Sequence, residues 1–256
     1  MRYFLEIAYR GTNYAGWQKQ NNAPSIQAEI EKALQVILKE EIAITGSGRT
    51  DTGVHASQQF AHFDTSHTIQ TGIGRSLNAI LPKDISILGV YEVGKEAHSR
   101  FDAISRKYRY KIIHEKNPFL EHLATLVPYK LDVSLMQEAA HKLLLYTDYE
   151  SFSKVKAHTK HFRCKINQAN WYYSKDIFSQ TEVLIFEITA NRFLWGMVRA
   201  IVGTLLEVGR KKLSIQDFEE VIVARNRAKA AGAALPEGLY LSEIKYPYSL
   251  DSLKRH

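Results

Sequence analysis

The chain has 256 residues, of which 45% are hydrophobic, so it is long enough to bury one large core or two smaller ones. No apolar run reaches the length of a membrane span, and the alternating start of the chain does not have the form of a signal peptide, so we expect a cytoplasmic protein. Lysine and arginine number 34 against 27 acidic residues, and this net charge of +7 favours nucleic acid over a membrane surface as the partner. The single cysteine, Cys164, excludes an internal disulfide, and the ten histidines lack the spacing of a zinc site, so no metal is predicted.

The first hundred residues predict the element order βαββαβ. Tyr3, Leu5, Ile7 and Tyr9 alternate along one face of a strand. Apolar residues then recur at helical spacing after Pro24-Ser25, with Gln27, Glu31, Lys32 and Gln35 on the opposite face, which predicts an amphipathic helix over a sheet. The remaining predicted elements are a short strand at 41–45, a strand at 56–64, a helix at about 68–80 and a strand at 85–93.

The second half of the chain repeats this order with one added helix. Tyr108, Tyr110 and Ile112 alternate with basic residues and predict a strand. Asp132 is expected to cap the next helix, and Ser214 with Asp217 forms the pattern of a capping box. The other predicted elements are strands near 165–174, 181–190 and 239–246 and a helix at about 195–209.

Two split-βαβ (ferredoxin-like) halves of this kind can join their sheets edge to edge. The sequence therefore predicts an α+β fold with one long, mostly antiparallel sheet, helices on one face and an RNA-binding cleft on the other. We place the boundary at residue 104, so that residues 1–104 form an N-terminal half and residues 105–256 a C-terminal half.

The stretch GSGRTDTGVHA at 46–56 predicts a tight, exposed loop between two strands. Its three glycines permit positive φ and leave room for a bulky ligand. Arg49 would keep the carboxylate of Asp51 ionised, and an ionised carboxylate can act as a nucleophile or a base. The alternative interpretation is that Thr50, Asp51 and Thr52 only form a turn closed by glycine and have no catalytic role. An aspartic protease would need a second loop of this type, which the sequence lacks.

The same loop resembles the GRTDxGVHA signature of the tRNA pseudouridine synthase A (TruA) family, and the other landmarks of that family follow in order. These are YRGTNYAGWQKQ at 9–20, NAILPKDI at 78–85, HSRFDAISRKYRY at 98–110, FLWGMVRAIVGTLLEVG at 193–209 and EGLYL at 237–241. The resemblance covers essentially the full chain. It departs from the family pattern at Arg10, where an aspartate is usual, and at Trp195-Gly196, where polar residues are common.

The resemblance implies an isomerase that converts uridine to pseudouridine at positions 38, 39 and 40 of the tRNA anticodon stem-loop. It implies no cofactor, and a homodimer with tRNA bound across both subunits. Asp51 matches the nucleophile, Tyr108 the ring that stacks on the flipped uracil, and Arg49 a residue that contacts RNA or fills the space the base leaves. Arg199 matches a partner of Asp51, which implies an active site in a cleft between the halves. Without the resemblance, Tyr108 would be interpreted as a core residue, and Arg49 as an arginine that pairs with a surface carboxylate.

Three further expectations concern neighbouring residues. His55 is expected to be a structural hydrogen-bonding residue, and Trp17 to pack under the loop. The basic segment 147–164, with Lys154, Lys156 and Lys160, suits contact with an RNA backbone or forms a solvated loop, and both interpretations stay open. The alternative functions are a non-catalytic RNA-binding protein on the same scaffold and a pseudouridine synthase acting on another RNA.

Overall fold

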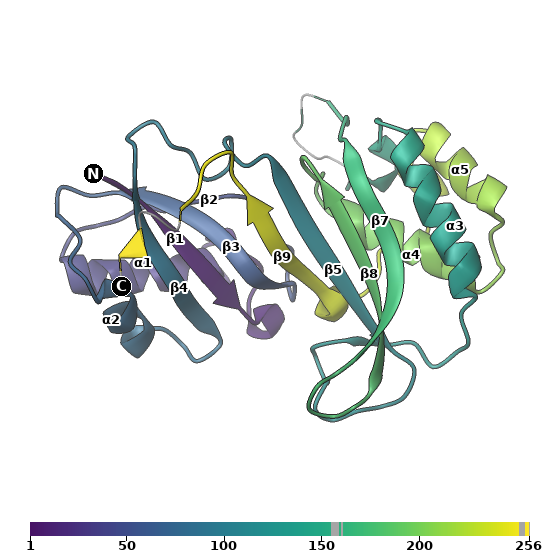
Figure 1. Cartoon of the computed structure of the whole chain (residues 1–256), viewed down its shortest axis with the longest axis horizontal. Coiled ribbons are helices and arrows are strands. Elements are labelled where there is room, and N and C mark those ends of the chain that lie inside the picture. Colours follow the sequence, from purple (N-terminus) through teal and green to yellow (C-terminus); the bar gives the residue numbers. More distant parts are fainter. Residues whose placement is uncertain (155–158, 160, 251–253, 256) are drawn as a thin grey trace. The chain divides into compact units, whose positions relative to one another are not determined.

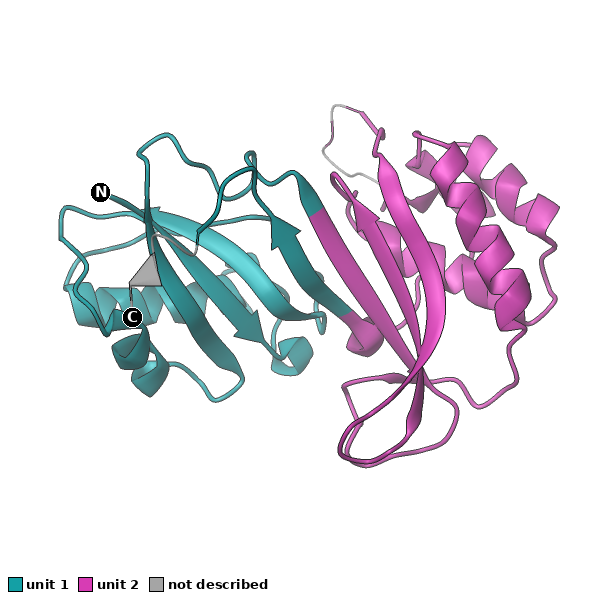
Figure 2. Ribbon diagram, viewed as in Figure 1, with its two compact units in different colours: residues 1–105, 240–256 teal, residues 106–239 magenta. Residues whose placement is uncertain are grey.

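The computed structural model describes residues 1–154, 159, 161–250 and 254–255 (Figure 1). Its contacts divide the chain into two compact units (Figure 2). Unit 1 comprises Met1–Ser105 together with Tyr240–His256, and unit 2 comprises Arg106–Leu239. The predicted domain boundary at residue 104 stays a prediction. The compact units differ from the predicted halves in one respect, because they assign the C-terminal segment to unit 1.

Unit 1 is a sheet with two helices packed against it. Its strand order is β10-β4-β1-β3-β9, in which β1 pairs antiparallel with both β3 and β4 while β9 runs parallel to β3. The elements are β1 (Arg2–Tyr9), α1 (Ile26–Leu38), β2 (Thr45–Gly46), β3 (His55–Asp64), α2 (Ile73–Ile80), β4 (Ile85–Val93), β9 (Leu239–Lys245) and β10 (Lys254–Arg255). Tyr3, Leu5 and Ile7 of β1 are fully buried, as their alternation predicts.

The strand predicted at 41–45 is wrong, because only the two-residue β2 forms there. The backbone of Ile44 bonds to side chains of α1 instead of to a neighbouring strand. Its N–H donates to the Glu31 carboxylate at 3.1 Å, and its carbonyl oxygen accepts from the Gln27 amide at 3.1 Å. Gln27 and Glu31, predicted on the outer face of the helix, are therefore buried polar residues that anchor this segment.

The helix predicted from about residue 68 is shorter than expected. It begins at Ile73, after Gly72, whose φ of 96° lies in the left-handed region and prevents the helix from extending further back. The final strand, predicted at 239–246, is confirmed as β9. Its partner is β3, with His55 opposite Tyr240, and the Ile244 N–H also donates to the Gln58 side chain at 2.9 Å.

Unit 2 has the strand order β5-β8-β7, with both pairings antiparallel, and the short β6 runs parallel to β5. Its elements are β5 (Ser105–Ile113), β6 (Thr125–Leu126), α3 (Val133–Lys142), β7 (Ile166–Lys175), β8 (Glu182–Ala190), α4 (Met197–Gly209) and α5 (Ile215–Val223). Helix α3 contacts α4, α5 and β7 (Figure 1). Both predicted N-caps are confirmed, because Asp132 accepts from the Leu135 N–H and Ser214 forms the full capping box with Asp217.

The predicted α+β class with a mostly antiparallel sheet is confirmed. Two parallel pairings, β3 with β9 and β5 with β6, make the arrangement mixed. Among the residues that the structure describes, no helix combines the length and the apolar character needed to cross a bilayer.

Candidate active site

The loop that carries Asp51 is bonded along its backbone to the loop that follows β1. The Trp17 N–H donates to the Thr50 carbonyl oxygen at 3.2 Å, and the Gly53 N–H donates to the Tyr14 carbonyl oxygen at 3.3 Å. These two bonds lie on either side of Asp51 in the sequence. The backbone of the candidate nucleophile is therefore anchored both before and after it.

Close approach of these two loops requires glycine at two positions. A Cβ atom at Gly11 would lie 2.0 Å from the Val54 carbonyl oxygen, and one at Gly16 would lie 2.4 Å from the Thr50 carbonyl oxygen. Gly16 also has a φ of 94°, which L-residues with a side chain rarely adopt. The sequence YRGTNYAGWQ thus supplies the two residues without a side chain that allow this contact.

The three glycines of the Asp51 loop differ in their roles. Only Gly53 has a positive φ, of 78°, so the expectation of positive φ is wrong for Gly46 and Gly48. Gly46 instead makes room for the indole of Trp17, since a Cβ there would lie 2.4 Å from its Nε1 atom. Trp17 is only 2% exposed, which confirms that it packs under the loop.

His55, at the start of β3, is a structural hydrogen-bonding residue, as predicted. It is buried, and its Nδ1 atom accepts from the Gly11 N–H at 3.0 Å. An acceptor at Nδ1 places the proton of the neutral ring on Nε2. His55 therefore helps to hold the two loops together.

Asp51 and Arg49 have different surroundings. Asp51 is half-buried, and its carbonyl oxygen accepts from the Val54 N–H at 3.1 Å, which closes the turn. Arg49 is exposed, and it makes no hydrogen bond or ion pair with the described residues. Its charge faces solvent and is available to an anionic ligand rather than being neutralised by Asp51.

In unit 2, Tyr108 and Tyr110 lie on the same face of β5 but differ in burial. Tyr110 is fully buried, shares a hydrogen bond of 2.7 Å with Thr125 and donates to the Leu235 carbonyl oxygen at 2.9 Å. Burial raises the pKa of Tyr110 to about 12, so its hydroxyl stays protonated. Tyr108 is only half-buried. Its ring meets that of Phe193 edge to face at 5.0 Å between centroids.

Arg199 lies in the first turn of α4 and is fixed by one neighbouring segment. Its Nε–H donates to the Ala234 carbonyl oxygen at 2.7 Å, and the Ala234 N–H donates to the Arg199 carbonyl oxygen at 2.9 Å. The segment lies tight against the helix, because a Cβ at Gly203 would be 1.9 Å from the Gly232 carbonyl oxygen. The direction of the guanidinium is thus set by the fold of unit 2. The predicted pairing of Arg199 with Asp51 stays a prediction.

A sequence profile described as tRNA pseudouridine synthase matches residues 7–102 and 139–247 of this chain. This chain belongs to the tRNA pseudouridine synthase family. The tRNA pseudouridine synthase A of Porphyromonas gingivalis is 44% identical over 252 residues, covering 97% of this chain and 98% of the relative. The enzyme of Parabacteroides distasonis is 43% identical, covering 97% of this chain and 97% of the relative. That of Exiguobacterium sibiricum is 36% identical, covering 97% of this chain and 98% of the relative. The predicted family and enzyme class, an isomerase acting on tRNA, are confirmed.

Sequence reasoning missed two contacts of this synthase. The first is the contact between Phe193 and the ring of Tyr108. Phe193 begins the FLWGMVR block, but the block by itself assigns it no role. The ammonium group of Lys154 lies 4.0 Å from the centre of the Trp195 ring. The backbone N–H of Lys154 also donates to the Trp195 carbonyl oxygen. The unusual Trp195 therefore holds Lys154, within the basic segment, in place. Lys156 and Lys160 of that segment lie outside the described residues.

We expect Tyr108→Phe to lower kcat by roughly two orders of magnitude, because it removes a hydroxyl that would lie near the C5 proton when the ring stacks on uracil. The ring and its packing on Phe193 stay in this variant. Tyr108→Ala should cost more, since stacking on a base contributes about 1–3 kcal/mol. Turnover of tRNA under saturating and subsaturating conditions measures both effects. Tyr173→Phe, on an exposed part of β7, is the matched control. Wild-type turnover in both Tyr108 variants would remove this residue from the site.

Proposed function

We propose that this enzyme isomerises uridine to pseudouridine at positions 38, 39 and 40 of the tRNA anticodon stem-loop, with Asp51 as the nucleophile. The observation that carries the proposal is the rigid support of Asp51. Its loop is bonded on both sides to the loop after β1, at Thr50 and at Gly53. A carboxylate held in one place before the substrate arrives is what a reaction that relies on positioning requires.

The reaction breaks the bond between N1 of uracil and C1′ of ribose and joins C5 to C1′ after the base has turned. The C5 proton leaves and N1 takes up a proton, so that substrate and product have the same atoms. Asp51 can serve by attacking the sugar or the base or by assisting elimination. A rigid loop supports each of these routes, and none requires a cofactor.

In this proposal each of the other three residues has a separate role. The ring of Tyr108, braced by Phe193, stacks on uracil. Arg49 contacts RNA or occupies the space that the base leaves, in keeping with its exposed and unneutralised side chain. Arg199, whose direction is fixed by Ala234, pairs with the carboxylate of Asp51.

The direct test uses tRNA labelled with tritium at C5 of uridine. Incubation with the enzyme should release tritium when uridine stands at positions 38, 39 or 40, and replacement of all three by cytidine should end the release. Pseudouridine should also disappear from these positions in tRNA of cells that lack the protein. Release that persists with cytidine at all three positions would mean that another RNA position is the substrate. Tight tRNA binding without any release would favour the non-catalytic RNA-binding protein.

We also propose that the enzyme acts in the cytoplasm as a homodimer with tRNA across both subunits. Light scattering should give twice the mass of the 29.3 kDa chain. A monomer that retains full turnover would contradict the dimer.

Affinity for tRNA should fall steeply with added salt, because lysine and arginine that neutralise phosphates release bound counterions. Replacing Lys154, Lys156 and Lys160 together with alanine should reduce the slope of log K against log salt by about 0.7–0.9 for each phosphate that these lysines neutralise. Filter binding over a series of salt concentrations measures that slope. An unchanged slope would make the segment a solvated loop, and the RNA would bind elsewhere on the protein.

A further inference from the structure

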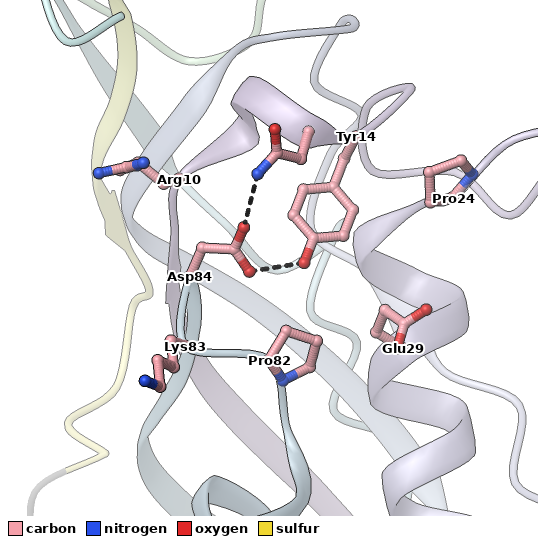
Figure 3. A pocket seen from close by; sticks show the side chains of 8 residues that line it. Arg10, Tyr14, Pro24, Glu29, Pro82, Lys83 and Asp84 are labelled. Carbon is pink, nitrogen blue, oxygen red and sulfur yellow. Dashed lines mark hydrogen bonds between the residues drawn. The ribbon is translucent and has the colours of Figure 1, made fainter. Parts of the chain in front are cut away.

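Unit 1 contains a cavity of about 580 Å³ that none of the four proposed site residues lines (Figure 3). It is formed by the loop after β1, the start of α1 and the turn before β4. The lining residues are Arg10, Asn13, Tyr14, Pro24, Glu29, Pro82, Lys83 and Asp84. Its volume falls within the range of sites that bind small molecules, about 300–1,000 Å³.

One side of the cavity carries two exposed cations, Arg10 and Lys83, which lie on the same side of Asp84 in Figure 3. Neither side chain forms a hydrogen bond or an ion pair within the part of the chain that the structure describes. The backbone of Arg10 is nonetheless fixed, because its N–H donates to the Asp84 carbonyl oxygen at 2.8 Å. An arginine and a lysine that both line one side of a cavity and have no ion pair with the described residues suit a phosphate group.

The carboxylate of Asp84 is occupied by its neighbours. The Tyr14 hydroxyl donates to one oxygen at 2.6 Å, and the Asn13 amide donates to the other at 3.3 Å. Burial, together with this bond to Asp84, raises the pKa of Tyr14, so the hydroxyl stays protonated and the bond persists. Each oxygen of Asp84 therefore has one protein donor, and these two bonds fix the carboxylate in the wall of the cavity.

The other side of the cavity offers apolar surface and one acceptor. Pro24 and Pro82 contribute apolar side chains, and Glu29 of α1 contributes a half-buried carboxylate (Figure 3). This carboxylate makes no hydrogen bond or ion pair among the described residues. A ligand that fits all of these groups has an anion at one end, a flat body and an N–H donor at the other. A ribonucleotide with an exocyclic amino group has this chemistry.

We propose that the cavity binds one ribonucleotide of the tRNA substrate, with its phosphate at Arg10 and Lys83 and its base amino group at Glu29. The inference rests on the proposed function. A nucleotide within tRNA is favoured over a free one because the cavity wall and the Asp51 loop share a support. The same Tyr14 that lines the cavity accepts a hydrogen bond from Gly53, two residues after Asp51. RNA in this cavity would therefore contact the loop that supports the candidate nucleophile.

The test measures tRNA affinity, its salt dependence and steady-state turnover for Arg10→Ala/Lys83→Ala and for Glu29→Ala. The double variant should raise Kd and KM about tenfold, lower the salt slope by about 0.7–0.9 and leave kcat unchanged. Glu29→Ala should raise Kd severalfold, whereas an acidic residue that only repels RNA would give tighter binding when removed. Lys95→Ala, at another exposed lysine of unit 1, is the matched control and should change none of these values. Thermal melting checks that each variant is folded.

Kd and salt slope equal to wild type in the double variant, or tighter binding by Glu29→Ala, would overturn the cavity proposal while turnover remained intact. The second arm titrates CMP, AMP and GMP. Micromolar binding of a free nucleotide that the double variant abolishes, with tRNA affinity unchanged, would identify a free-nucleotide site and overturn the assignment to tRNA. Failure of the proposed function looks different, because the wild-type enzyme would then release no tritium whatever the cavity binds.

Discussion

Replacing Asp51 with alanine is expected to reduce tritium release from tRNA below detection while tRNA binding persists. The substitution removes the only carboxylate of the loop and little surface. The backbone bonds of Thr50 and Gly53 do not involve the side chain, so the loop should keep its path. Arg49 and Arg199 are unchanged in this variant.

Asp51→Asn should be equally inactive, because it keeps the shape of the side chain and removes its charge and nucleophilicity. Thr52→Ala is the matched control, since Thr52 is the exposed neighbour in the same turn and should leave turnover unchanged. Normal tritium release with weakened binding in the Asp51 variants would mean that this residue only shapes its turn. The proposed chemistry would then be wrong.

Gly16→Ala should both destabilise the protein and disable the site. The left-handed φ of Gly16 and the 2.4 Å approach of the Thr50 carbonyl oxygen leave no room for a methyl group. Strain and overpacking together predict a loss of about 3 kcal/mol in the free energy of unfolding. The Thr50 backbone must move to relieve the clash. Asp51 moves with it, and a misplacement of this kind can lower kcat roughly a hundredfold.

Urea unfolding and tritium release under native conditions measure these two effects separately. Gly48→Ala is the control within the Asp51 loop. Its φ is not positive, and a Cβ there would have no heavy atom within 4 Å among the described residues outside its own neighbourhood. Stability and turnover of Gly16→Ala that match those of Gly48→Ala would show that the support from the loop after β1 is dispensable.

Much of the local structure could be predicted from the sequence because the causes are local. The alternation of Tyr3, Leu5 and Ile7 defines β1, and the side chains of Ser25, Asp132 and Ser214 cap the helices that follow them. The family could also be predicted from the sequence, because several of its motifs are long, nearly unbroken runs of residues that occur in the expected order. Tyr108 and the core residue Tyr110 have the same strand periodicity, so only the position of each tyrosine within the HSRFDAISRKYRY motif could distinguish them.

The tertiary structure alone decided how distant segments support one another. Gln27 and Glu31 have the helical spacing of surface residues, yet they bind the backbone of Ile44, thirteen or more residues away. Residue 16 must be glycine because its φ is positive and because a distant carbonyl group, that of Thr50, lies where a Cβ atom would be. Strand β9 joins unit 1 through β3 although it follows unit 2 in the chain. Each of these contacts depends on which segments meet in space, and neither periodicity nor capping patterns carry that information.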